Sequence, residues 1–187
     1  MHKVKKYIAE DLKFSNQTIK EMKINSKKFY NKIKERRSIR EFSKDKIDIN
    51  IIKNAILSAG SAPSGANLQP WHFVVIKNKT VKKKIRIEAE KEEENFYNYK
   101  APKEWLDALT PLGTDENKKF IENAPYLIAI FEKKLSVSKN KKIKNYYVKE
   151  SGGIATGILI TCLHFSGLAM LTPVSYTHLT LPTNREV

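Results

Sequence analysis

The spacing of hydrophobic residues in the first third of the chain predicts an amphipathic helix. Ile49, Ile52, Ile56 and Ala59 recur at intervals that place their side chains on one helix face. Asp48 precedes them as a candidate N-cap, and Gly60 follows them where a helix is expected to end. The pattern therefore predicts a helix between Asp48 and Gly60.

Two continuous apolar runs predict buried strands. They are WHFVVIK at 71–77 and PYLIAIFE at 125–132, and both are rich in β-branched and aromatic residues. A third run, LAMLT at 168–172, starts like a strand and is cut short where the composition changes. Helices interleaved with such strands indicate an α+β or α/β domain around a central sheet.

The remaining segments give less regular patterns. An amphipathic stretch begins at Phe29 and Ile33, and Thr80 is a candidate cap for a long polar helix that ends near Tyr99. A loop containing Pro102 and Pro111 is expected after that helix. The other expected elements are a loop at 61–70, a short helix at 114–124, an exposed basic loop at 133–144 and an apolar helix at 144–166.

Residues 152–171 carry no formal charge and, as a helix, would be long enough to cross a membrane. Gly152, Gly153 and Gly157 fall on one small-residue face, and His164 adds a polar group. These features favour a buried helix packed closely against another element. No membrane partner is expected.

Composition bounds the class of protein and its compartment. The chain has 187 residues, 41% hydrophobic and 29% charged, which is ordinary for one globular domain. Cys162 is the only cysteine, so neither a disulfide framework nor a thiolate cluster is expected. His2, His72 and His164 lack the spacing of metal ligands, so no metal site is predicted. The N-terminus lacks the apolar core of a secretory signal, which predicts a cytoplasmic protein.

The formal net charge of +15 would suit a polyanion, such as nucleic acid or a phosphate-bearing cofactor. However, the excess is mostly lysine and accompanies abundant isoleucine and asparagine, the composition that AT-rich codons produce. The basic loop at 133–144 has no interleaved aromatic residues, which favours a solvated loop. A nucleic-acid-binding module is therefore the least favoured function, and no nucleic-acid partner is predicted.

Two short motifs could hold a ligand. RRSIR at 36–40 gathers several guanidinium groups and a hydroxyl, which suit a phosphate because each guanidinium offers a planar fork of donors. The alternative for this motif is a solvated basic helix end. Pro63, Ser64 and Gly65 form a tight turn whose backbone N–H groups can point at a ligand, or simply a connection from helix to strand.

Together, the two motifs, separated by one amphipathic helix and followed by a buried strand, resemble the FMN-dependent nitroreductase superfamily. Asn67, Gln69, Pro70 and Trp71 also fit that superfamily. The resemblance covers about 29–172 and implies an α+β, nitroreductase-like fold with a central mixed β-sheet surrounded by helices. The residues that it implies for FMN binding are Arg36, Arg37, Ser38, Ile39, Arg40, Pro63, Ser64 and Thr172.

Within the superfamily the chain is most similar to the iodotyrosine deiodinases, the reductive halotyrosine dehalogenases. In that branch a helical lid supplies a Glu and a Tyr, and a nearby helix supplies a Lys, which hold the amino acid end of the substrate. The matching residues here are Glu93, Tyr97 and Lys118, with the backbone N–H of Ala66 from the loop. The spacing to Trp105 matches as well.

The physical chemistry of a zwitterion supports this assignment. Its ammonium needs an acceptor and its carboxylate a donor, and Glu93 and Lys118 have the required opposite charges. Glu93 and Tyr97 are four residues apart, on one helix face. The other acids of this cluster, Glu90, Glu92 and Glu94, are expected to be solvated surface.

The resemblance also implies a homodimer with FMN at the subunit interface, and reduction by NAD(P)H either directly or through a partner reductase. The function it implies is reductive dehalogenation of a halotyrosine. The alternative is a general NAD(P)H-dependent nitroreductase or quinone reductase of the same fold, in which Glu93, Tyr97 and Lys118 happen to match.

The last residues, PVSYTHLTLPTNREV, abandon the lysine, isoleucine and asparagine bias of the chain. Written as GTC TCT TAT ACA CAT CTG ACG CTG CCG ACG, the codons of 174–183 resemble a transposase adapter of sequencing libraries, and the index and stop codon would follow. We therefore expect an N-terminal arm at 1–28, an incomplete, C-terminally truncated domain at 29–172 and an artefact at 173–187.

Thr172 matches the start of the segment that brings a threonine hydroxyl near the flavin N5 atom in the deiodinases, which makes it the candidate catalytic residue. A later arginine that helps to bind FMN in that branch has no counterpart. The chain as written is therefore expected to be inactive and poorly stable.

Overall fold

The chain divides into two compact units, Met1–Glu35 and Arg36–Val187. The computed structural model describes residue 9 and residues 11–138 and 141–173, without the side chains of Ser138 and Lys141. Helix α1 (Ile19–Ile33) runs through the predicted boundary after residue 28, so the division into units comes after this helix ends. The three-part division at 28 and 172 stays a prediction, and 174–187 lie outside the described residues.

Helix α1 begins ten residues earlier than the predicted amphipathic stretch at Phe29, because a capping box starts it. The Thr18 N–H donates to Glu21 Oε2 at 2.7 Å, and the Glu21 N–H donates to Thr18 Oγ1 at 3.3 Å. The Glu21 carboxylate accepts from the Thr18 N–H and, at 2.8 Å, from the Thr18 hydroxyl, and these two hydrogen bonds, the backbone one first, hold the pKa of Glu21 below its ordinary value. No residue of α1 is buried.

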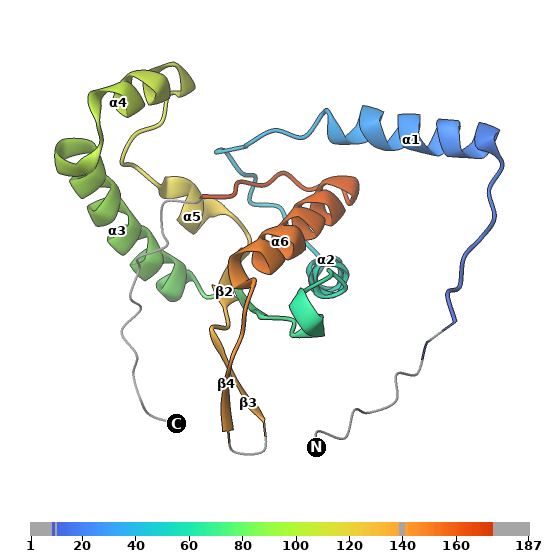
Figure 1. Cartoon of the computed structure of the whole chain (residues 1–187). Helices are drawn as coiled ribbons and strands as arrows, with labels where there is room; N and C mark the ends of the chain where they lie inside the picture. Colours follow the sequence, from blue (N-terminus) through green and yellow to red (C-terminus); the bar gives the residue numbers. More distant parts are fainter. Residues whose placement is uncertain (1–8, 10, 139–140, 174–187) are drawn as a thin grey trace. The chain divides into compact units, whose positions relative to one another are not determined.

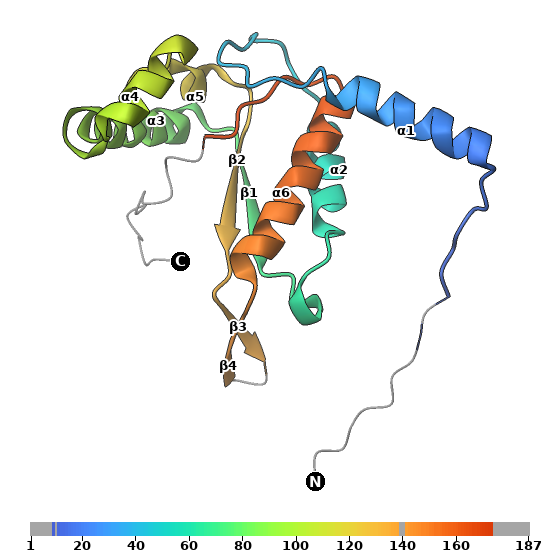
Figure 2. The ribbon, with the colours of Figure 1, turned by 45° about the horizontal axis from the view of Figure 1, so that its top comes forward.

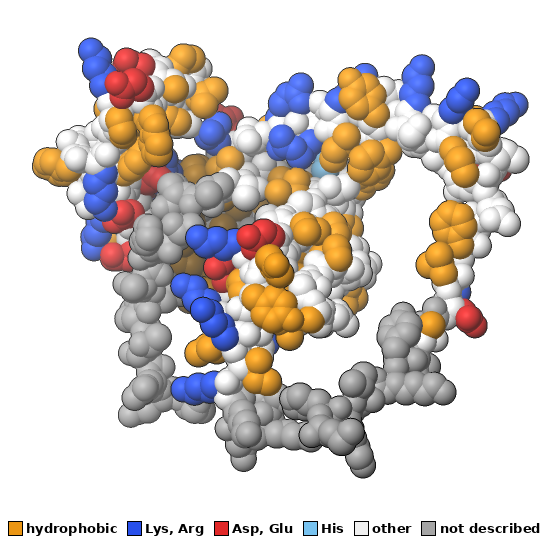
Figure 3. Space-filling view, in the orientation of Figure 1, with side chains coloured by type: hydrophobic (Ala, Val, Ile, Leu, Met, Phe, Trp, Pro, Cys, Tyr) orange, Lys and Arg blue, Asp and Glu red, His pale blue; other side chains and the backbone are white. Residues whose placement is uncertain are grey.

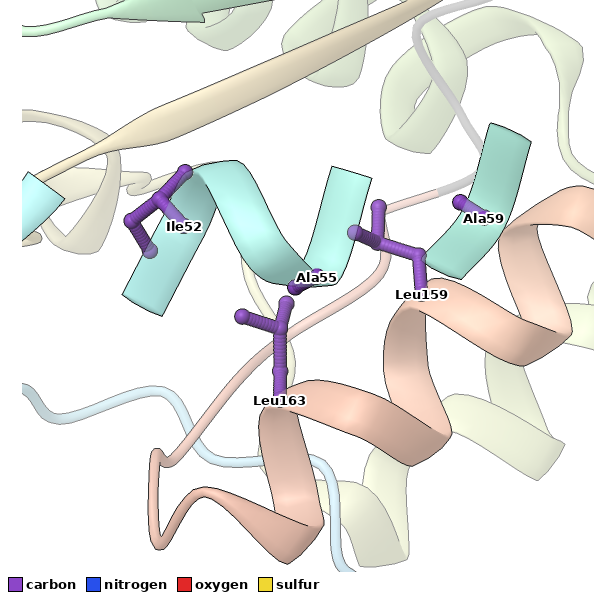
Figure 4. Close-up of a cluster of buried hydrophobic side chains, with 5 residues drawn as sticks. All are labelled: Ile52, Ala55, Ala59, Leu159 and Leu163. Carbon is purple, nitrogen blue, oxygen red and sulfur yellow. The ribbon is translucent and has the colours of Figure 1, made fainter. Parts of the chain in front are cut away.

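Helices α2 (Ile49–Gly60) and α6 (Val148–Phe165) pack together and form the core of the larger unit. The predicted cap of α2 is confirmed, since the Asn50 N–H donates to Asp48 Oδ1 at 2.8 Å. Ala55 and Ala59 leave room on α2 for two leucines of α6 (Figure 4). The core cluster consists of Ile52, Ala55, Ala59, Leu159 and Leu163, each at most 8% exposed.

Strands β1 (Trp71–Ile76) and β2 (Leu127–Glu132) confirm the two predicted buried runs and pair in antiparallel fashion. Phe73 stands opposite Ile130, and Val75 opposite Ile128. These four half-buried side chains share one face of the sheet because residues alternate between faces along a strand, and all four pack against the core cluster. Helix α6 therefore covers this face, with α2 beside it (Figures 1 and 2).

The third predicted strand, LAMLT, is reduced to one contact in the described residues. Met170 forms an isolated parallel bridge with Ser38, and the Ile39 N–H donates to the Met170 carbonyl at 3.1 Å. The predicted α+β class is confirmed, but the described residues form two separate two-stranded antiparallel sheets and this parallel bridge rather than one continuous mixed sheet.

The basic segment at 133–144 is a hairpin, so the prediction of a loop was wrong. Strands β3 (Leu135–Ser138) and β4 (Lys141–Lys144) pair with Leu135 opposite Lys144. The buried Asn145 closes its base: its amide donates to the Lys133 carbonyl at 2.6 Å and to Ser136 Oγ at 2.9 Å. Lysines dominate the composition of this segment, which masked its strand alternation.

The long polar helix is α3 (Lys79–Asn95), which continues into a π-helical turn, Phe96–Lys100. Its cap is Asn78 rather than Thr80, because Asn78 Oδ1 accepts from the Val81 N–H at 3.1 Å. Figure 3 shows basic and acidic side chains interleaved along α3.

The predicted loop after α3 instead holds helix α4 (Lys103–Leu109) and a 3-10 turn (Thr110–Leu112). Pro102 stands before the first helical residue of α4, a position where its missing N–H costs nothing. The predicted short helix is α5 (Lys119–Asn123), which begins after Lys118 and lies against α3.

The glycine face of α6 does not pack closely in the described residues, which corrects the expectation for Gly152, Gly153 and Gly157. A Cβ atom built on any of the three would meet no atom within 4 Å. The packed face of α6 is instead lined by Ser151, Ala155, Leu159 and Leu163. Within the described ranges, no helix combines the length and apolarity that spanning a membrane requires.

Candidate functional site

A cavity of about 710 Å³ opens beside helices α3, α4 and α5 of the larger unit. Its volume lies within the range of about 300–1,000 Å³ typical of small-molecule sites. Figures 1 and 2 show these three helices beside one another. Of the residues singled out from the sequence, six line the cavity: Arg40, Glu93, Tyr97, Trp105, Lys118 and Thr172.

Glu93 and Lys118 form a buried ion pair at the cavity wall. Glu93 Oε2 lies 3.0 Å from Lys118 Nζ, and the two residues are 6% and 7% exposed. The same ammonium donates to the Asp115 carbonyl. Two opposite charges held out of water at a cavity can bind a ligand that carries both an ammonium and a carboxylate, because each group finds its complement.

Tyr97 lies in the π-helical turn that follows α3. Its hydroxyl donates to Thr114 Oγ1 at 3.1 Å, and its ring centroid is 6.0 Å from Lys118 Nζ. Single π-helical turns are frequent at functional sites, because the extra residue changes which side chains share the helix face. Here the turn leaves Glu93 and Tyr97 on the same cavity, as their spacing predicted.

An apolar wall completes this side of the cavity. Phe96 lies 6.3 Å, centroid to centroid, from Trp105, and Leu109 lies beside them on the lining. Trp105 remains 59% exposed. Phe96, Leu109 and Thr114 were missed from the sequence, although the apolar spacing of Trp105 and Leu109 on one helix face offered a signal. The wall suits a flat apolar group, such as an aromatic ring.

The parallel bridge brings Arg40 and Thr172 to the cavity. Ser38 pairs with Met170, and the residues two positions further along each segment, Arg40 and Thr172, both line the cavity. Segments separated by more than a hundred residues therefore meet at one wall. The remaining members of the RRSIR motif, Arg36, Arg37, Ser38 and Ile39, do not line the cavity.

The loop motif also lies outside the cavity lining, including Pro63, Ser64 and Ala66. Its backbone is unusual: Ala66, Asn67 and Gln69 have φ values of 47°, 54° and 46°. Left-handed conformations at residues other than glycine are sparsely populated, and where they persist they often mark functional sites. Ser64 Oγ accepts from the Gln69 N–H at 2.9 Å and helps to hold this shape.

Tyr147 and Tyr146 support the same loop from the start of α6. A Cβ atom on Gly65 would lie 3.0 Å from Tyr147 Cδ2, so a larger residue would require the tyrosine ring to shift by a few tenths of an ångström. Ala66 is exposed next to it. The loop thus presents backbone groups at the surface rather than to the cavity of its own chain.

The acid cluster of α3 is less solvated than the sequence indicated. Glu94 is exposed as expected, but Glu92 is half-buried and pairs with Lys100 at 2.8 Å. Glu90 is also half-buried and contacts both Arg86 and the backbone of Lys118. The prediction of solvated surface was therefore wrong for Glu90, because helix α5 covers it.

Known proteins resemble this chain over most of its length. An iodotyrosine deiodinase of Haliscomenobacter hydrossis is 47% identical over 153 residues, covering 81% of this chain and 69% of that protein. An iodotyrosine deiodinase of Hydra vulgaris is 40% identical, and the match spans 81% of this chain but only 56% of that protein.

Solved structures give the same result for the fold. Oxidized iodotyrosine deiodinase bound to FMN and 3-iodo-L-tyrosine superposes with a TM-score of 0.68 at 30% identity, covering 75% of this chain and 71% of that one. An FMN-dependent nitroreductase from Clostridium difficile has a TM-score of 0.55 at 25% identity, covering 81% of this chain and 67% of that one. The nitroreductase family model matches residues 33–171. The chain belongs to the nitroreductase family.

Proposed function

We propose that this protein is an FMN-dependent oxidoreductase that reductively dehalogenates a halogenated tyrosine. The observation that carries the proposal is the buried pair of Glu93 and Lys118 at a cavity with an aromatic wall. In the reaction, a carbon–halogen bond is replaced by a carbon–hydrogen bond, two electrons and a proton are consumed, and halide leaves. Relatives that are named iodotyrosine deiodinases support the assignment.

Recognition of the amino acid end would replace the internal ion pair by two pairs with the substrate. The Glu93 carboxylate would accept from the substrate ammonium, and the Lys118 ammonium would donate to the substrate carboxylate. Because both side chains are already buried and oriented, little further desolvation or ordering is needed. Tyr97 and the apolar wall would then contact the rest of the substrate and exclude water.

Guanidinium and hydroxyl groups of this chain are of the kind that bind a phosphate-bearing flavin, and Arg40 and Thr172 bring one of each to the cavity. Arg40 lies at the cavity, and the other residues proposed to hold FMN are Arg36, Arg37, Ser38, Ile39, Pro63, Ser64 and Thr172. FMN, when bound and reduced, supplies the two electrons. The guanidinium groups would bind its phosphate, and the Thr172 hydroxyl would donate a hydrogen bond toward the isoalloxazine ring. NAD(P)H is the proposed electron source, and its oxidation by the purified protein can be followed directly.

A homodimer would complete the site. Pro63, Ser64 and Ala66 do not line the cavity of their own chain, and a second copy would have to supply these backbone groups. The exposed small and apolar face of α6, with Ile154 47% exposed, is a surface that such a copy could cover. Sedimentation of the flavoprotein tests this: a monomer that retains FMN and binds iodotyrosine would contradict it.

The experiment that tests the function is titration of the FMN-loaded protein with 3-iodotyrosine while flavin fluorescence is measured. We expect saturable quenching, and we expect Tyr97→Phe to weaken binding about threefold to tenfold, because it removes the hydroxyl that donates to Thr114. Bound flavin with no response to iodotyrosine would contradict the proposal and favour the general nitroreductase or quinone reductase.

The C-terminal artefact and the cytoplasmic location are further proposals. Amplifying the locus from source DNA tests the first, and recovery of the same codons after Thr172 with the same stop would refute it. If different codons are recovered, the experiments on flavin and substrate binding use the protein encoded by the source DNA. Imaging of the tagged protein tests the location.

A further inference from the structure

Helix α5 is too short to satisfy its own backbone, and α3 satisfies it at both ends. At the C-terminal end, the Lys82 ammonium donates to the carbonyls of Glu122 at 2.8 Å and Ala124 at 2.5 Å. At the N-terminal end, the Lys118 N–H donates to Glu90 Oε1 at 2.9 Å. A helix of a few residues leaves most of its terminal groups without intrahelical partners, so these contacts define where it lies.

Lys82 binds the C-terminal end of α5. It is 4% exposed, and this burial lowers its pKa because the ammonium loses hydration. Both carbonyls that it contacts lie at the junction of α5 and β2. Lys82 does not line the cavity. Its contacts hold the C-terminal end of α5 and do not involve Lys118, the residue proposed to bind the substrate.

Arg86 holds Glu90 in place at the other end. Its Nη1 lies 2.5 Å from Glu90 Oε2, and its Nε lies 2.7 Å from Glu122 Oε2. The hydrogen bond to the Glu122 carboxylate raises the pKa of Arg86 further, so the guanidinium stays charged. Both oxygens of Glu90 are therefore engaged, one by Arg86 and one by the backbone of Lys118.

Four residues on one face of α3 make the contacts described here with α5 and with Lys118, which precedes it. Lys82, Arg86, Glu90 and Glu93 follow one another at intervals of three or four residues, which places them on one helix face. Lys82 and Glu90 contact backbone groups at the two ends of α5. Arg86 contacts the Glu122 side chain, and Glu93 contacts the Lys118 side chain. Backbone and side chain of Lys118 are thus both held by α3.

We infer that Glu90, braced by Arg86, is a positioning residue for halotyrosine recognition: its hydrogen bond to the Lys118 N–H sets where the Lys118 ammonium stands. This inference rests on the proposed function. Glu90 and Arg86 do not line the cavity, so they act through Lys118 rather than on the ligand. Misplacement of a binding group by a fraction of an ångström is enough to weaken recognition.

Positioning and simple charge predict opposite results, which makes the inference testable. The Glu90 carboxylate is a negative charge near the proposed carboxylate site, so a pure field effect would make its removal tighten binding of the substrate anion. Loss of positioning weakens binding instead. Glu90→Gln removes the charge and keeps one acceptor oxygen for the Lys118 N–H, but its NH2 group cannot accept from Arg86, so positioning is weakened rather than lost.

The experiment compares 3-iodotyrosine with its methyl ester on the FMN-loaded protein by flavin fluorescence. The ester lacks the carboxylate that Lys118 would bind. We expect the unaltered protein to prefer the acid, and Glu90→Ala to weaken the acid about tenfold while leaving the ester unchanged. Glu90→Gln should retain part of the preference, because its one amide oxygen can still accept from the Lys118 N–H. Glu88→Ala is the matched control, since Glu88 pairs with Lys91 on the exposed face of α3 and should change neither probe.

The outcomes distinguish the proposed role of Lys118 from the positioning role of Glu90. An unaltered protein that ignores iodotyrosine, or binds acid and ester equally, overturns the proposed role of Lys118 and this inference with it. Glu90→Ala with full preference for the acid, or with tighter acid binding, overturns the positioning role alone. If Glu90→Ala retains no FMN, Arg86→Gln replaces it: about a threefold loss of preference is expected, and an unchanged preference refutes the inference.

Discussion

Replacing Glu93 with glutamine is expected to weaken halotyrosine binding about 100-fold, because it removes the charged partner of the substrate ammonium. It also leaves the Lys118 ammonium buried without its carboxylate. Breaking a buried ion pair in this way is expected to lower the free energy of unfolding by about 3–5 kcal/mol. Flavin fluorescence titration measures the first effect and urea unfolding the second.

A double variant separates recognition from stability. Glu93→Gln combined with Lys118→Met removes both charges, so no unpaired ion remains, and the free energy of unfolding should return to within about 1–2 kcal/mol of the original. Halotyrosine binding should stay lost, because neither substrate charge has a partner. A double variant that recovers both stability and binding would show that this pair stabilises the fold and does not recognise the substrate.

Glu94→Gln is the matched control for the single variant. It makes the same chemical change at the next residue of the same helix, where the side chain is exposed. Surface substitutions of this kind usually change stability by less than about 0.5 kcal/mol. A loss of binding in Glu94→Gln comparable to that in Glu93→Gln would mean that the net charge of α3, rather than the buried carboxylate, attracts the substrate.

The elements predicted from the sequence are those whose local pattern and packing agree. Asp48 caps α2 by accepting from a backbone N–H of the first turn. The apolar runs of β1 and β2 form strands whose residues pack against the same core. The β3–β4 hairpin was missed because lysines conceal its alternation, and its pairing depends on the buried Asn145. Such tertiary contacts leave no periodic signal in the sequence.

The candidate site also contains residues that the sequence predicts and residues that it does not. Glu93 and Tyr97 were predictable from their spacing on one helix, and Lys118 from the family resemblance, and all three reach one cavity. The role of Glu90 was not predictable, because it depends on where α5 lies against α3. A charge run gives the composition of a helix face, whereas the contacts of each carboxylate depend on what covers that face.

Replacing Leu159 with alanine is the second large effect that the structure predicts. Leu159 is 4% exposed and packs in the core cluster with Ala55 and Ala59 of α2. These alanines have no side chain long enough to fill the space, so a cavity should remain, and the free energy of unfolding should fall by about 2–5 kcal/mol in urea denaturation. Leu57→Ala on α2 is the control, since Leu57 is 72% exposed and should change stability by less than about 0.5 kcal/mol. Equal losses in the two variants would mean that the exposed side of α2 is covered in the assembled protein, which would place a partner surface on α2 as well as on α6.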